Sequence, residues 1–141
     1  MPMPMPVSDA QVRPFAMRLP QDESAPALAR EALAEVLDPR SPLFDAGRLC
    51  LTEVVTNALR HTDTRGLRLM LIADTSGLFA AVGDSSAALP MSRHTGDDPL
   101  PDEGRGTEVL GALADSWGYD RTRSGKWVWF RLHGRSGDPE S

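Results

Sequence analysis

Two apolar runs, LRLMLIA at 67–73 and LFAAV at 78–82, flank a short turn and constrain the fold more than any other stretch. The first run alternates, so that three leucines share one face of an extended chain: Leu67, Leu69 and Leu71. The intervening DTSG at 74–77 has the composition of a tight turn. We therefore predict a β-hairpin here, which places at least two strands in an antiparallel sheet.

The rest of the chain mixes helical and extended patterns around this hairpin. A strand is predicted at 13–20, helices at 27–37, 43–61 and 107–117, and further strands at 117–122 and 126–132. In the last strand, one face carries Val128, Phe130 and Leu132, and the other carries Trp127 and Trp129. Because the strands group into hairpins, we expect an α+β fold, a two-layer sandwich in which a mostly antiparallel mixed sheet has helices on one face.

The length of 141 residues suits a single domain, which we place at 13–133. Prolines alternate with methionines at the start of 1–12, which excludes a helix there, and we expect a disordered lead-in. A flexible tail is expected at 134–141. Residues 83–106 hold three prolines and several acids without apolar periodicity, and a loop of that length is usually functional or disordered.

Composition excludes several classes of protein. The formal net charge of -5 argues against a nucleic-acid-binding protein. We find neither an apolar run long enough to span a membrane nor a secretory signal, so we expect a cytoplasmic protein without membrane contact. The single cysteine, Cys50, excludes a disulfide framework and lies where a small buried hydrophobe is expected. The three histidines lack the spacing of metal ligands.

Glu53 and Asn57 lie one turn apart in the predicted helix at 43–61, and Asn57 falls within its apolar stripe. An amide oxygen is a ligand that Mg²⁺ accepts together with waters and substrate phosphates, and a nearby carboxylate is able to act as a base. A buried amide also forms ordinary hydrogen bonds with backbone carbonyls, and Glu53 is equally consistent with a solvated helix residue. From this pair alone the purely structural interpretation is favoured.

Asp84 directly follows Gly83 at the end of the second hairpin strand. A carboxylate at a strand end that faces a pocket accepts a hydrogen bond from an exocyclic amine, such as that of adenine. The more common alternative is a turn residue that bonds its own backbone.

Gly104, Arg105 and Gly106 immediately precede the predicted helix at 107–117. Glycines allow the backbone to approach an anion, and the free amides and dipole of a helix N-terminus favour phosphate. A flexible loop that ends in a helix is the alternative. The preceding DDPLPDE is not an apolar strand, which excludes a Rossmann motif, and nothing matches G-x-x-x-x-G-K-[ST].

Four stretches, taken in order, resemble the ATPase superfamily shared by gyrase, heat-shock chaperones and sensor histidine kinases. EVVTNALRH resembles its N-box, VGDSSAALP its adenine-binding aspartate segment, DEGRGTEVLGALADSWG its glycine box, and SGKWVWFRL its last hairpin strand. The chain resembles in particular the small anti-sigma-factor serine kinases of actinobacteria. The resemblance covers about residues 13–132 and implies the histidine-kinase-like ATPase fold.

The resemblance also implies ATP and Mg²⁺ as cofactors. Asn57 would ligate a magnesium ion that bridges the phosphates, Glu53 would be the catalytic residue that polarises a water or an incoming hydroxyl, and Asp84 would receive the adenine amine. A lid over ATP is expected at about 85–105. The implied cofactor-binding residues are Asn57, Asp84, Gly104, Arg105, Gly106 and Thr107.

The implied activity is that of a serine/threonine protein kinase that binds a sigma factor and phosphorylates a serine of an antagonist protein. Two departures motivate an alternative, a catalytically weak or inactive nucleotide-binding or protein-interaction module of the same fold. SSAA follows Asp84 where D-x-G-x-G is usual, and Glu108 places an acid near the expected phosphates. A structural domain is a third hypothesis. The sequence does not decide whether the chain forms a homodimer; if it does, an exposed Trp127 or Trp129 would be a contact residue.

Overall fold

The computed structural model describes residues 14–60, 66–84, 93–95, 105–122 and 125–134, without the side chains of 93–95, 105–107 and 121–122. In chain order the elements are β1 Phe15–Leu19, α1 Ala25–Val36, α2 Phe44–Arg60, β2 Leu67–Asp74, β3 Gly77–Asp84, β4 Arg93–Thr95, α3 Arg105–Leu113, β5 Ser116–Thr122 and β6 Gly125–His133. The predicted lead-in at 1–12, most of the lid at 85–105 and nearly all of the tail lie outside the described residues.

The strands form a six-stranded sheet in the order β1-β2-β3-β6-β5-β4, and every described strand pair is antiparallel. The predicted hairpin is confirmed as β2 and β3. Asp74 pairs with Gly77, so its turn contains only Thr75 and Ser76. Gly77 has a φ of +147°, a backbone conformation that side-chain-bearing residues rarely adopt.

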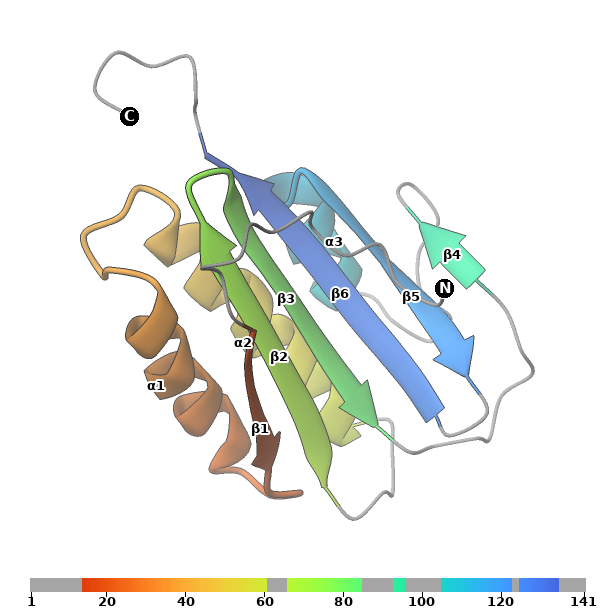
Figure 1. The fold of residues 1–141 in the computed structure, drawn as a ribbon. Helices are drawn as coiled ribbons and strands as arrows, with labels where there is room; N and C mark the ends of the chain where they lie inside the picture. Colours follow the sequence, from red (N-terminus) through yellow and green to blue (C-terminus); the bar gives the residue numbers. More distant parts are fainter. Residues whose placement is uncertain (1–13, 61–65, 85–92, 96–104, 123–124, 135–141) are drawn as a thin grey trace.

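The helices cover one face of the sheet, as Figure 1 shows, which confirms the predicted α+β two-layer architecture. Side chains alternate along each strand, so every second residue points toward the helices. The core between the layers combines these strand residues with buried residues of α1 and α2. From β2, β3 and β6 it contains Leu67, Leu69, Leu71, Leu78, Ala80, Val82, Val128, Phe130 and Leu132, and β1 and β5 add Leu19, Trp117 and Tyr119.

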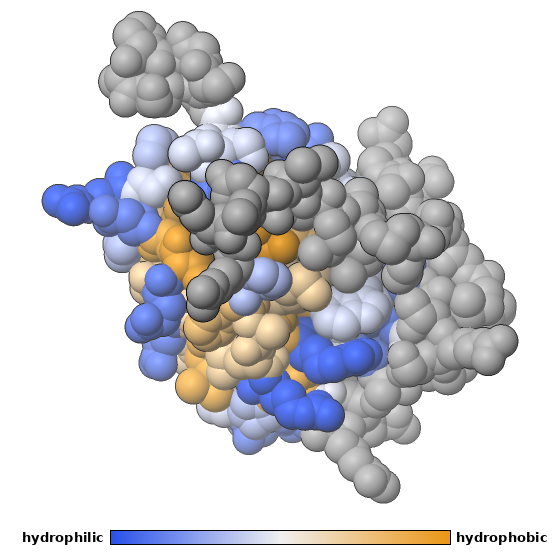
Figure 2. Space-filling view, in the orientation of Figure 1, coloured by the Kyte–Doolittle hydropathy of each residue, from blue (hydrophilic) through white to orange (hydrophobic). Residues whose placement is uncertain are grey.

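The opposite face of the sheet carries a second apolar cluster of four buried residues: Ile72, Phe79, Ala81 and Trp129. Figure 2 shows apolar side chains gathered on this face between hydrophilic ones. Trp129 is only 3% exposed, so the expectation of an exposed contact tryptophan is wrong at this position. Trp127 is half-buried and packs against the cluster, and its ring centroid lies 4.8 Å from the Arg68 guanidinium carbon.

Two elements differ from the sequence prediction. The third helix was expected to reach residue 117, but α3 ends at Leu113, and Trp117 pairs with Phe130 in the sheet. Burial of the Trp117 ring between sheet and helices therefore overrides the helical periodicity. The short strand β4 was not predicted, because its three residues become a strand only by pairing with β5.

Candidate functional site

Helix α2 carries Asn57 on its buried stripe, in line with Cys50, Leu51, Val54 and Val55. Asn57 is 9% exposed, which confirms that this amide falls within the apolar face of the helix. Burying an amide is costly unless it forms hydrogen bonds. The position therefore requires partners for the amide.

Asp84 is the last residue of β3 rather than a loop residue after it, and it is 4% exposed. Asp84 lies two residues after Val82 and four after Ala80, so all three side chains point to the same side of the sheet. That side is the one covered by the helices. Residue 84 pairs with Lys126 of β6, and this pairing extends the strand beyond its predicted end at 82.

The fold brings Asn57 and Asp84 to the same pocket, between α2 and the sheet. Lys126 also lines this pocket. The remaining described lining is apolar and comes from α2, β3, α3 and β6: Val54, Ala58, Val82, Leu110 and Val128. An apolar cleft with a few convergent polar groups is the usual character of a small-molecule site.

Within α2, the guanidinium of Arg60 donates a hydrogen bond from Nη1 to Asn57 Oδ1 at 3.1 Å. A carbonyl oxygen has two lone pairs, so this bond leaves one for another donor or for a cation. Among the described residues, no cluster of three or more His, Cys, Asp or Glu side chains could hold a metal ion. A magnesium ion shared with waters and phosphates would require only one or two protein oxygens, and Asn57 Oδ1 is an oxygen of that kind.

Glu53 precedes Asn57 by one turn of α2 and is half-exposed. It is absent from the described residues that line the pocket. Burial, assisted by the negative charge of Glu53, raises the pKa of the Cys50 thiol to about 12. The expectation that Cys50 is a buried hydrophobe rather than a reactive thiol is confirmed, since it is fully buried.

The predicted phosphate-binding residues fall at the start of α3. Arg105, Gly106 and Thr107 form its first turn, so the helix begins two residues earlier than expected. Gly104 lies outside the described residues. The first amides of a helix have no partner within it and point outward from its N-terminus. Leu110, one turn further along α3, reaches the pocket that contains Asn57 and Asp84.

Two residues near Asn57 and Asp84 were missed by sequence reasoning, Arg60 and Lys126. Arg60 follows Asn57 by three positions, which places it on the same side of the helix. Lys126 carried a compositional signal, because it is the single lysine of the chain. Its position in the pocket, however, depends on pairing between strands that lie far apart in sequence.

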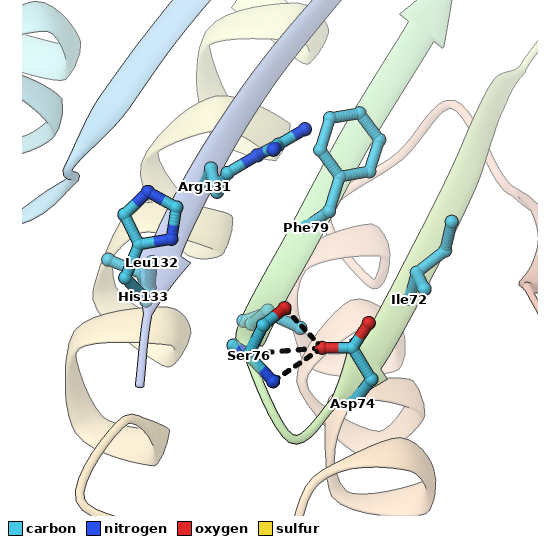
Figure 3. Close-up of a pocket in the computed structure, with 9 residues that line it drawn as sticks. Ile72, Asp74, Ser76, Phe79, Arg131, Leu132 and His133 are labelled. Atoms are coloured by element: carbon cyan, nitrogen blue, oxygen red, sulfur yellow. Dashed lines mark hydrogen bonds between the residues drawn. The ribbon is translucent and has the colours of Figure 1, made fainter. Parts of the chain in front are cut away.

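A second pocket lies at the opposite end of β3, beside the β2–β3 turn (Figure 3). The Asp74 carboxylate there accepts hydrogen bonds from Ser76 N at 2.7 Å, Ser76 Oγ at 2.6 Å and Gly77 N at 3.2 Å. Arg131 reaches over the Phe79 ring, 5.4 Å from its centroid. Because Asp74 Oδ1 already accepts hydrogen bonds from its own turn, we interpret this pocket as a structural feature of the hairpin and not as a ligand site.

Comparison with known proteins identifies the family. Curated proteins gave no match to the chain. A family model described as the histidine kinase-like ATPase domain matches residues 11–132, most of the length. Among the described residues, no helix is long and apolar enough to cross a membrane. The α+β fold agrees with the family match, and the chain therefore belongs to the histidine kinase-like ATPase domain family.

Proposed function

We propose that this protein is a cytoplasmic, ATP-binding regulator of the anti-sigma-factor serine kinase type. The observation that carries the proposal is the convergence of Asn57 and Asp84, from a helix and a distant strand, on one pocket. In the proposed complex, Asp84 accepts a hydrogen bond from the adenine amine. The apolar side chains of the pocket contact the faces of the base.

Phosphate binding is proposed at the other side of the pocket. Asn57 would hold magnesium through its side-chain oxygen, and the backbone amides of Gly104, Arg105, Gly106 and Thr107 would donate hydrogen bonds to phosphate oxygens. Bound ATP and magnesium supply the phosphoryl group and neutralise its charge, so the protein contributes mainly positioning. Glu53, one turn from Asn57, polarises the attacking hydroxyl.

The proposed partners are a sigma factor and an antagonist protein that receives the phosphate on a serine. A homodimer is also proposed. Trp127 remains the candidate contact, because Trp129 is buried whereas Trp127 is half-buried.

The nucleotide proposal is tested by thermal unfolding with ATP and Mg²⁺, because a ligand that binds only the folded state raises its stability. We expect ATP to stabilise the wild-type protein. Asp84→Asn should reduce ATP affinity by about tenfold or more, the value of one charged hydrogen bond. Asp38→Asn is the matched control, because Asp38 is exposed and its carboxylate, within the described part of the chain, accepts hydrogen bonds only from Arg40. Equal stabilisation of all three proteins would contradict the assignment of Asp84.

A second candidate function is a nucleotide-binding or protein-interaction module with weak or no kinase activity. It is favoured by the absence of Glu53 from the described pocket lining. Purified protein, labelled ATP and candidate antagonist proteins separate the two functions. Transfer of label to a serine supports the kinase, and its loss in Glu53→Gln supports the role of Glu53. Measurable ATP binding without transfer to any antagonist supports the module.

A further inference from the structure

Lys126 faces Asp84 across the β3–β6 ladder. The two residues are register partners, and both line the pocket that contains Asn57. Lys126 is half-buried, and its Nζ lies 5.7 Å from the centre of the Tyr119 ring. The pocket therefore places a carboxylate and an ammonium on neighbouring strands, with apolar side chains around them.

Lys126 differs in type from every other Lys or Arg position of the chain, because all the others are arginines. Lysine and arginine together number 15, and Lys126 is the only lysine. A lysine ammonium is a compact point charge on a flexible stem, whereas a guanidinium is a broad planar fork. An ammonium is therefore the basic group better suited to contact a single ring nitrogen in a narrow pocket.

We propose that Lys126 is a specificity-determining residue that reads the nucleobase together with Asp84, an inference that rests on the proposed ATP site. The Asp84 carboxylate accepts a hydrogen bond from the exocyclic amine of adenine. The Lys126 ammonium donates to a ring nitrogen beside that amine, either N1 or N7. The pair thus presents one acceptor and one donor, which matches the donor and acceptor that adenine offers side by side.

This pairing also accounts for discrimination between bases. Guanine carries a carbonyl oxygen in place of the adenine amine, so an Asp84 carboxylate at that position would face another acceptor. A buried polar group that is left without its partner destabilises the complex by the full free energy of its desolvation. Sites that bind through such groups reject analogues lacking the matching atom much more strongly than apolar pockets reject a missing methylene.

The first test combines altered protein with altered ligand. Binding of ATP, 1-deaza-ATP and 7-deaza-ATP is measured by calorimetry for wild type, Lys126→Met and Lys126→Arg. We expect one deaza analogue to bind wild type about tenfold more weakly than ATP, the value of one charged hydrogen bond. Lys126→Met, which keeps the apolar stem, should bind ATP and that analogue equally. Undiminished discrimination in Lys126→Met would overturn the proposal.

Because Lys126 is the only lysine, its reactivity provides a second test that needs no substitution. Acetylation of the native protein with an N-hydroxysuccinimide ester is followed by mass spectrometry, with the α-amino group as internal reference. ATP with Mg²⁺ should slow acetylation of Lys126, whereas inorganic tripolyphosphate, which lacks a base, should not. Equal protection by both would overturn contact with the base.

The measurements distinguish failure of the ATP site from failure of the role of Lys126. If ATP neither stabilises nor protects the wild-type protein, the ATP site and the role of Lys126 are both wrong. If ATP binds but both deaza analogues bind wild type as tightly as ATP, only the role of Lys126 is wrong. A urea titration of each variant verifies that it is folded.

Discussion

Arg60 donates a hydrogen bond to the side-chain oxygen of Asn57 across one turn of α2, at 3.1 Å. The donor is an exposed arginine, whereas the acceptor is a buried amide on the apolar stripe of the helix. A helix that needed only packing at this position would be better served by an aliphatic residue. The side-chain oxygen of Asn57 is therefore expected to have a role beyond packing, and substitution tests this directly.

The change Asn57→Leu separates a binding role from a packing role. If Asn57 serves the nucleotide, binding of ATP with Mg²⁺ is lost, while the free energy of unfolding stays within about 1 kcal/mol of wild type because the freed Arg60 remains solvated. Urea denaturation and calorimetry measure the two quantities. Arg60→Ala is the control, since it removes the partner and keeps the amide. A loss of stability above about 2 kcal/mol with intact ATP binding would favour the packing role.

Gly77 is required by the hairpin, so Gly77→Ala should destabilise the protein strongly. Its φ of +147° disfavours any side chain, and a Cβ there would collide with the Leu132 carbonyl oxygen of β6. The backbone conformation alone costs about 1–3 kcal/mol, and the forced shift of β6 adds to it. Urea denaturation measures the change.

Gly111→Ala is the matched control for Gly77→Ala, because a Cβ at Gly111 in α3 would meet no atom within 4 Å. Alanine should stabilise that helix by about 0.5–1 kcal/mol relative to glycine. Similar effects of the two substitutions would contradict the positive φ of Gly77 and its close approach to the Leu132 carbonyl oxygen.

Asp74 gives the hairpin a pH dependence. Hydrogen bonds from Ser76 hold the pKa of Asp74 below its ordinary value of 3.8, and the bond from the Ser76 hydroxyl has the largest effect. Since the folded pKa is the lower one, the stabilisation is complete above the unfolded pKa and is lost as the pH falls through the folded pKa. Wild type and Asp74→Ala should therefore differ most near neutral pH and converge in strong acid. A difference that grows on acidification would contradict this assignment.

The single thiol provides a probe of local opening. Burial raises the pKa of Cys50 to about 12, so essentially no thiolate exists in the folded protein near neutral pH. A disulfide reagent should label the native protein slowly and the urea-unfolded protein completely. ATP should slow native labelling further if opening of α2 disrupts the pocket. Rapid labelling of the native protein would contradict the burial of Cys50.

Sequence patterns located most elements because their apolar periodicity is local. The hairpin of β2 and β3, the long helix α2 and the alternating strand β6 were all predicted close to their observed bounds. Periodicity failed at Trp117, where a helical spacing continues past the true end of α3. The side chain is buried there by pairing with β6, a contact that a local pattern does not contain.

The sequence alone determined the α+β class and nominated Asn57 and Asp84, because burial on a stripe and position at a strand end depend on neighbours along the chain. The tertiary structure decided that these two residues share a pocket, that Lys126 faces Asp84, and that Glu53 is absent from the described lining. The reason is physical. Strand order and register bring together residues dozens of positions apart, and both are fixed by packing of the whole core.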